Sequence, residues 1–149
     1  MASMTLTSPA FQPNEKIPPR YTCDGDNINP PLHIHDVPLG TRSLALIVDD
    51  PDAPKGTWTH WIVWNINPRT PEIAENTVPR ESYAGKNTWH RNSYGGPCPP
   101  SGTHHYFFKL YALDTVPELA GNASREQLEE AMEGHVVATA ELVGLYGRA

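Results

Sequence analysis

Several short apolar segments of the chain alternate in the two-residue period of β-strands. Residues 43–48 (SLALIV) form a short apolar run after Ser43, which is typical of a strand buried on both faces. Residues 58–66 and 104–112 follow, and both are rich in aromatic side chains. Residues 135–146 resume the strand pattern near the C-terminus. The alternation therefore predicts a sheet built largely from these four segments.

Weaker signals predict the smaller strands. Residues 1–16 alternate weakly and indicate a short edge strand, and residues 32–37 indicate another. Residues 67–89 have mixed polarity and several prolines, so we expect a long connection that contains one short strand.

The composition also favours a mainly β fold with long ordered loops, because 16 prolines and 11 glycines disfavour helices. One helix is expected over residues 122–134, where Ser124 and Gln127 form a capping box and Gly134 ends the helix. A chain of 149 residues fits one domain, spanning residues 1–149.

Polar side chains gather at the ends of the predicted strands. A loop of roughly ten residues separates the first two long strands, so the simplest arrangement pairs them as antiparallel neighbours. Asp50 and Asp52 then share one rim with His60. If the third long strand is also antiparallel to the first, His104 and Tyr106 reach the same edge.

Strict alternation also assigns faces to these strands. Along the second long strand, one face is expected to carry Trp58, His60, Ile62 and Trp64. On the third, His104 and Tyr106 share a face and His105 points the opposite way. The preceding residues, 95–101, hold two glycines and three prolines and form a stiff loop. Such a loop, delivering a His and a Tyr to a strand end, builds a small polar pocket.

The charge balance limits the kinds of partner. Seventeen acidic residues against eleven basic ones leave a net charge of −6, which argues against a broad surface for nucleic acid or anionic membrane. No apolar run approaches the ~20 residues that span a bilayer, and residues 1–11 lack signal-peptide features. We therefore expect a soluble, cytoplasmic protein. Cys23 and Cys98 both lie in Pro/Gly-rich loops that can bring them together, which leaves a disulfide open, but reduced thiols are the expectation for a cytoplasmic protein.

Several sequence motifs resemble those of a known protein family. DPDAP at residues 50–54, WTHW at 58–61 and GGPCPPSGTHHY at 95–106 resemble the phosphatidylethanolamine-binding protein (PEBP) family, which includes Raf kinase inhibitor proteins and plant flowering regulators. RYTCDGDNINPPL at 20–32 and the ending EGHVVATAELVGLYGR at 133–148 are similar to its prokaryotic, Raf kinase inhibitor-like branch. The resemblance covers nearly the whole chain in the expected order.

The resemblance implies both a fold and a site. The fold is a large central antiparallel β-sheet packed against a smaller sheet, with few short helices. The site is a small pocket for phosphate-like anions at the sheet end. From the residues themselves we expect no catalytic residue, metal or cofactor there. Carried over by motif, the ligand-binding residues are Asp50, Asp52, Trp58, His60, Gly96, His104 and Tyr106.

The sequence also departs from the family pattern. Animal members read His-Arg-Tyr where this chain has His104, His105 and Tyr106, and they end in a helix that lines the ligand site. The tail here is β-like, so a lipid-headgroup pocket of the same shape does not follow. The family often holds prolines of the DPDAP turn in the cis form, which makes Pro51 or Pro54 a candidate.

Two imidazoles that face a partly buried cavity suit an anion, since each can donate an N–H and protonation adds charge. A neighbouring carboxylate fixes the tautomer and repels an anion, so we expect Asp50 to orient a histidine or to be protonated. If protonation drives binding, the affinity for phosphate should rise as the pH falls through ~6.5, the ordinary pKa of histidine.

A hydrolase-like enzyme that uses the same Asp and His cluster is the alternative function. The spacings match no compact metal motif. Nothing marks Ser101 as an activated nucleophile, and Cys98 lies between prolines rather than at a helix N-terminus. A non-catalytic binding protein therefore agrees better with the sequence.

The resemblance implies protein partners as well. Family members inhibit kinases or proteases through surfaces around the pocket, and residues 87–93 are the first candidate for such a surface. An exposed Trp89 or Tyr94 would serve a homodimer, although burial is the simpler expectation for both. The expected partners are a small anionic or phosphorylated ligand and a protein kinase or protease, without nucleic acid or stable membrane insertion.

Overall fold

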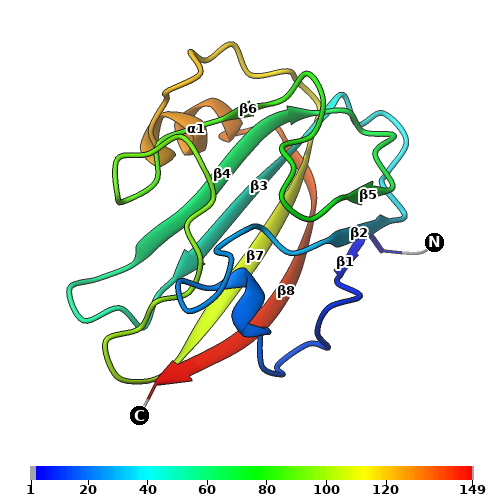
Figure 1. Cartoon of the computed structure of the whole chain (residues 1–149). Helices are drawn as coiled ribbons and strands as arrows, with labels where there is room; N and C mark the ends of the chain where they lie inside the picture. Colours follow the sequence, from blue (N-terminus) through cyan, green and yellow to red (C-terminus); the bar gives the residue numbers. More distant parts are fainter. Residues whose placement is uncertain (1–2, 149) are drawn as a thin grey trace.

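The computed structural model describes residues 3–148, which form two antiparallel β-sheets and one α-helix (Figure 1). The larger sheet has the strand order β6 (Tyr83–Ala84), β4 (Trp58–Ile66), β3 (Ser43–Asp50), β7 (Gly102–Leu113) and β8 (Val136–Arg148). The smaller sheet has the order β1 (Thr5–Thr7), β2 (Leu32–His35) and β5 (Glu72–Ile73). The predicted mainly β fold with a large and a small antiparallel sheet is confirmed.

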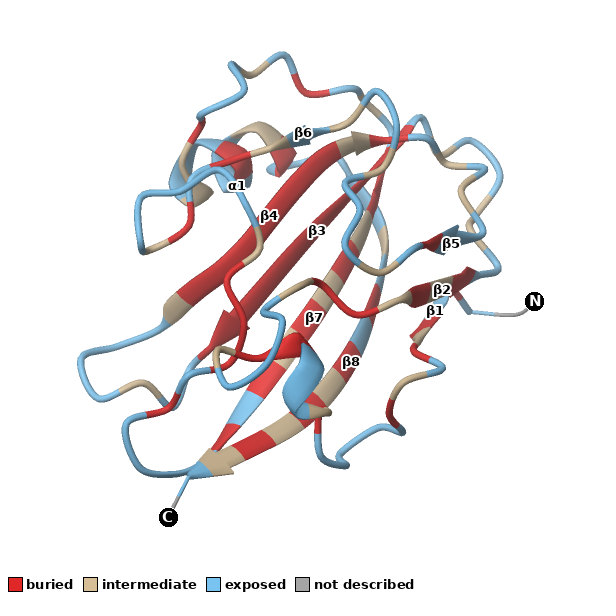
Figure 2. Cartoon of the chain, viewed as in Figure 1, coloured by how far each residue is buried: buried red, intermediate tan, exposed pale blue. Residues whose placement is uncertain are grey.

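Burial along the strands follows the sequence pattern (Figure 2). Every residue of β3 is buried, and its apolar run over residues 44–48 is covered on both faces, as predicted. The strand β4 is buried over most of its length as well. Along β7 and β8, buried positions mostly alternate with exposed or half-buried ones, because these strands lie toward one side of the sheet.

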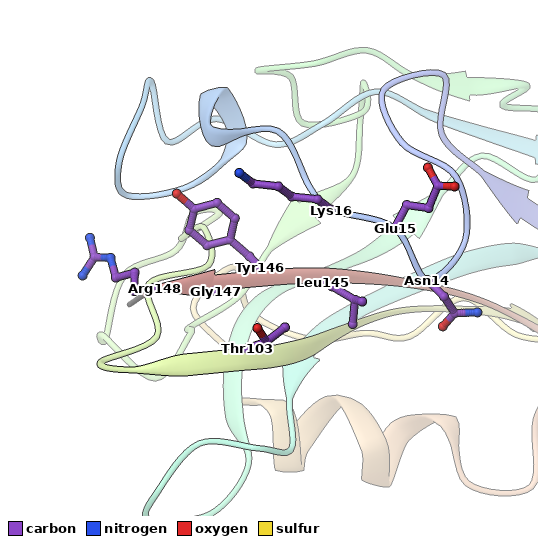
Figure 3. Close-up of a pocket in the computed structure, with 8 residues that line it drawn as sticks. All are labelled: Asn14, Glu15, Lys16, Thr103, Leu145, Tyr146, Gly147 and Arg148. Carbon is purple, nitrogen blue, oxygen red and sulfur yellow. The ribbon is translucent and has the colours of Figure 1, made fainter.

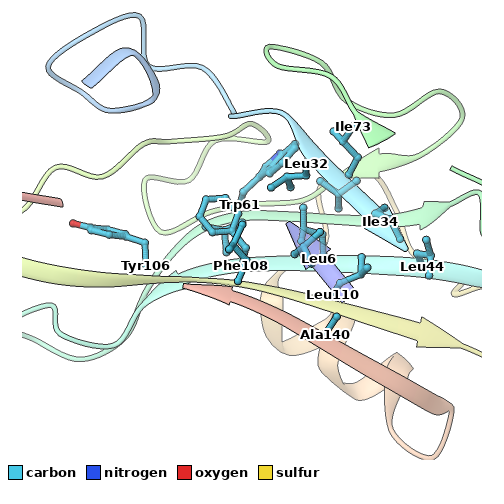
Figure 4. Close-up of a cluster of buried hydrophobic side chains, with 14 of the residues drawn as sticks. Leu6, Leu32, Ile34, Leu44, Trp61, Ile73, Tyr106, Phe108, Leu110 and Ala140 are labelled. Atoms are coloured by element: carbon cyan, nitrogen blue, oxygen red, sulfur yellow. The ribbon is translucent and has the colours of Figure 1, made fainter. Parts of the chain in front are cut away.

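The two faces of the large sheet pack against different partners. One face packs on the smaller sheet, and Figure 4 shows the apolar side chains between them, including Leu6 of β1, Leu44 of β3 and Phe108 of β7. The other face packs on α1 (Arg125–Met132) through Leu128 and Met132. The large sheet is therefore the middle layer of the fold.

The helix begins and ends where its sequence signals lie. The Ser124 hydroxyl accepts a hydrogen bond from the Gln127 N–H (3.2 Å), and the Gln127 side chain accepts one from the Ser124 N–H (2.9 Å). The predicted capping box is confirmed. Gly134 follows the helix with a φ of 80°, a left-handed conformation that suits glycine.

A β-bulge in β4 changes the predicted faces. Val48 pairs with Trp61 and Asp49 pairs with Thr59, so β4 has one extra residue, His60, at this point. The grouping of His60 with Ile62 and Trp64 is therefore wrong. Ile62 and Trp64 pack toward the helix, whereas Trp61 lies in the core between the sheets.

The edge strand, the long connection and the prolines after β3 show how the shorter segments follow or depart from the predictions. The short strand β1 lies at a sheet edge, as predicted for residues 1–16, of which residues 1–2 lie outside the described range. The long connection holds two short strands, β5 and β6, instead of one. The peptide bonds described for Pro51 and Pro54 are trans, so the expectation of a cis proline there is wrong. Among residues 3–148, no helix has the length and apolar character needed to cross a membrane.

The two cysteines form a disulfide, so the prediction of reduced thiols is wrong. The turn that contains Cys23 folds against the Gly/Pro loop that contains Cys98. The Cys23 N–H donates to the Pro97 carbonyl (3.1 Å), and the Gly96 N–H donates to the Asn27 side chain (2.8 Å). These contacts hold the two loops together where the two cysteines are bonded.

Removing the disulfide should lower the free energy of unfolding. Because the bond joins residues 75 positions apart, the double variant Cys23→Ala/Cys98→Ala should be destabilised by ~2–4 kcal/mol. Urea denaturation of the oxidised protein and the variant measures this difference. A reductant should destabilise the wild type alone. Equal stability of the oxidised wild type and the variant would contradict a stabilising disulfide.

Candidate functional site

A cavity of about 330 Å³ opens at the end of the large sheet where β3 ends and β4 and β7 begin. Five of the seven predicted site residues line it, namely Asp50, Trp58, His60, His104 and Tyr106. They meet because β3 is hydrogen-bonded antiparallel to β4 on one side and to β7 on the other. The end of β3 therefore lies beside the beginnings of both neighbours, as the sequence predicted.

Asp50 orients His104 within the cavity. The His104 Nδ1 lies 2.6 Å from the Asp50 Oδ2, and both residues are buried, at 7% and 3% exposure. A carboxylate oxygen accepts, so Nδ1 carries the proton and Nε2 remains for other partners. The second Asp50 oxygen accepts from the Asp52 N–H (2.8 Å), which fixes the turn after β3.

The imidazole of His60 is held by backbone. Its Nδ1 donates to the Gly95 carbonyl (2.7 Å), while the Gly95 N–H donates to the His60 carbonyl (2.9 Å). The residue is 3% exposed, and this burial lowers the pKa of His60 despite the opposing effects of the Gly95 carbonyl and the Asp50 charge. His60 therefore binds a proton less readily than an ordinary histidine, which favours the neutral imidazole near pH 7.

Tyr106 supplies a hydroxyl that is free to donate. The residue is 1% exposed, and within residues 3–148 its hydroxyl has no hydrogen-bond partner. Figure 4 shows the hydroxyl directed away from the apolar cluster. Burial, followed by the negative charge of Asp50, raises the pKa of Tyr106, so the hydroxyl keeps its proton. Its ring lies 5.3 Å from that of His60 and 6.4 Å from that of His104.

The remaining two predicted residues lie outside the cavity lining. The Asp52 carboxylate accepts from both the backbone N–H (2.8 Å) and the Nδ1 (2.7 Å) of His105, on the outer side of the turn. These hydrogen bonds lower the pKa of Asp52. Gly96 already donates its N–H to Asn27 and does not line the cavity. His105 is exposed, as its position in the alternation predicted.

Trp89 lines the cavity, although the sequence pattern gave it no place there. Its ring lies 5.0 Å from His60 and 5.4 Å from Trp58, edge-on to both, and 38% of the residue is exposed. Thr88 positions it by donating its N–H to the Thr59 carbonyl (2.9 Å). Trp89 lies in an irregular connection, where strand alternation carries no information.

A second cavity, of about 630 Å³, lies between β8 and residues 14–16 (Figure 3). Its two cationic side chains are already engaged. Arg148 pairs with the Asp24 carboxylate, and the Lys16 ammonium lies 5.9 Å from the centre of the Tyr146 ring.

In the described part of the chain, no three His, Cys, Asp or Glu side chains are placed to hold a metal ion.

Comparisons with known proteins agree with the fold. A family model for phosphatidylethanolamine-binding proteins matches residues 7–147. A UPF0098 protein of Methanothermobacter thermautotrophicus is 53% identical over 150 residues, which cover 97% of this chain and 99% of the relative. A solved structure from Chlamydia trachomatis, described as a PEBP homologue, has a TM-score of 0.95 and 44% identity, with 100% of both chains covered. Escherichia coli YbcL, described as a new member of the mammalian PEBP family, has a TM-score of 0.92 and 31% identity, covering 99% of this chain and 100% of YbcL.

His60 should titrate below its ordinary value of ~6.5, because burial lowers its pKa. Below that pH the unfolded chain binds a proton that the folded chain does not. The free energy of unfolding should therefore fall as the pH falls, by up to ~1.4 kcal/mol per pH unit between ~6.5 and the folded pKa.

NMR titration of the imidazole signals measures the pKa directly. Urea denaturation at about pH 7.5 and 5.5 measures the stability difference, which should be smaller in the His60→Asn variant because asparagine does not titrate there. A His60 signal that titrates at or above ~6.5 would show that burial does not govern this residue.

Proposed function

The chain belongs to the phosphatidylethanolamine-binding protein family, and from this we propose that it is a non-catalytic binding protein for a small anionic or phosphorylated group. The ligand lies in the cavity formed by Asp50, Trp58, His60, His104 and Tyr106. One observation carries the proposal: the buried Tyr106 hydroxyl has no hydrogen-bond partner within residues 3–148 and lies beside two imidazoles fixed through their Nδ1 atoms. A buried polar group of this kind calls for a partner.

The cavity provides what a small anion needs. The Tyr106 hydroxyl donates to an anionic oxygen, and His104 presents Nε2 because Asp50 occupies its Nδ1. Lys55 also lines the cavity and offsets the negative charge of Asp50. The indole rings of Trp58 and Trp89 form apolar walls. A volume of about 330 Å³ is at the small end of ligand pockets, which favours a compact ligand.

A regulatory role would follow from this binding step. Trp89 belongs to residues 87–93 and is both part of the cavity lining and 38% exposed, so a bound ligand touches a residue that a protein partner can also reach. We therefore place inhibition or regulation of a protein kinase or protease, the role implied by the family, at this cavity and its bordering loop.

Ligand binding can be tested by titrating isotope-labelled protein with inorganic phosphate and with phosphorylethanolamine. The largest NMR shift changes should fall on His60, Gly95, His104 and Tyr106. His104→Asn should weaken binding by about tenfold or more, since it removes Nε2. His35→Asn is the matched control, because His35 is an exposed strand histidine far from these contacts, and it should leave the affinity unchanged. Unaltered binding by the His104 variant would contradict the proposed site.

A further inference from the structure

His60 presents an acceptor to the cavity. Its Nδ1–H is occupied by the Gly95 carbonyl, and the nearby carboxylate of Asp50 is bonded to His104 instead. An imidazole that is 3% exposed and has no carboxylate hydrogen-bonded to it remains neutral. In a neutral imidazole with a proton on Nδ1, Nε2 carries a lone pair and accepts a hydrogen bond. The ligand must therefore supply a donor at this position.

The other polar groups around the cavity are of two kinds. Tyr106 offers a hydroxyl donor and His104 presents its Nε2, whereas Asp50 contributes a negative charge whose oxygens are already bonded to His104 and to the Asp52 N–H. Lys55 is the one Lys or Arg side chain that lines this cavity within the described residues. The cavity thus combines a donor, an acceptor and nearly balanced charge, and a fully deprotonated dianion does not match that combination.

We propose that the cavity selects tetrahedral oxyanions that still carry a proton, such as inorganic phosphate and phosphate monoesters, over those that carry none, such as sulfate and phosphate diesters. This inference rests on the proposed function and narrows its ligand class. The preferred ligand is a free phosphorylated small molecule, because the phosphate within an intact phospholipid is a diester without a P–OH group.

The selection follows from hydrogen bonding. A protonated phosphate oxygen donates to the His60 Nε2 while an unprotonated oxygen accepts from the Tyr106 hydroxyl. Sulfate and diesters have acceptors only, so they place a lone pair against Nε2 and leave that buried acceptor unsatisfied. Sites built to hydrogen-bond one group of a ligand strongly reject the analogue that lacks it. Phosphate and sulfate have nearly the same size and shape, so the proton is what distinguishes them.

Calorimetric titration of the full chain at about pH 6, where a phosphate monoester is half protonated, tests the selection. The four probes are inorganic phosphate, sulfate, methyl phosphate and dimethyl phosphate, at constant ionic strength. Phosphate should bind at least about tenfold more tightly than sulfate, and methyl phosphate should exceed dimethyl phosphate by a similar factor.

Two variants assign the preference to His60. In His60→Asn the side-chain amide can still donate to the Gly95 carbonyl, but Nε2 is gone, so phosphate and sulfate should bind within about threefold of each other. Tyr106→Phe removes a donor that both anions use, so it should weaken both similarly and preserve the preference. The Tyr106 variant should remain folded because its hydroxyl has no partner among residues 3–148, and circular dichroism checks both variants.

The outcomes separate this inference from the proposed function. If the wild type binds sulfate as tightly as phosphate, or dimethyl phosphate as tightly as methyl phosphate, the selection is wrong while anion binding stands. If the preference persists in a folded His60→Asn variant, its assignment to His60 is wrong. If the wild type binds none of the four probes, both the selection and the proposed function are wrong. Should His60→Asn not fold, the wild-type and Tyr106→Phe titrations still decide the selection.

Discussion

The antiparallel pairing of β3 with β4 on one side and β7 on the other is the constraint on which the site depends. It brings the end of one strand beside the beginnings of two others, so polar residues distant in the chain share one edge. A β-bulge in β4 then changes the face on which His60 lies. One extra residue in β4 lets His60 face the cavity while Ile62 and Trp64 still pack toward the helix. Without the bulge, strict alternation would put His60 on the helix side with them.

The same strand end links stability to ligand binding. Asp49 and Asp50 are adjacent and buried, and each is paired on a different face of the sheet. Asp49 contacts the Arg125 guanidinium of α1 (2.8 Å) and the Lys109 ammonium of β7 (3.1 Å), whereas Asp50 contacts His104. A buried carboxylate without such partners would be costly. The Asp49 ion pair with Arg125 thus joins the helix to the sheet, and the Asp50 contact orients the His104 imidazole toward the ligand.

Much of this arrangement could be predicted from the sequence, because it depends on local patterns. The apolar run of β3, the aromatic alternation of β7 and the Ser124 capping box each encode their element within a few residues. The opposite directions of His104 and His105 follow from the two-residue period alone.

The features that could not be predicted depend on tertiary contacts. The bulge at His60 needs the register of a partner strand, and the disulfide needs two loops 75 residues apart to fold together. Trp89 reaches the cavity through hydrogen bonds between Thr88 and Thr59, which no periodicity encodes. Asp52 was expected in the pocket by its motif, yet its contact with His105 turns its carboxylate outward.

The central claim is that the ligand's phosphate group binds in the cavity at the end of the large sheet. A crystal structure of the protein soaked with phosphorylethanolamine tests it most directly. We predict a phosphate group between the His60 Nε2 and the Tyr106 hydroxyl, within hydrogen-bond distance of both. This placement would be contradicted by phosphate density confined to the other cavity, beside Lys16 and Arg148, with the space between His60 and Tyr106 filled by water.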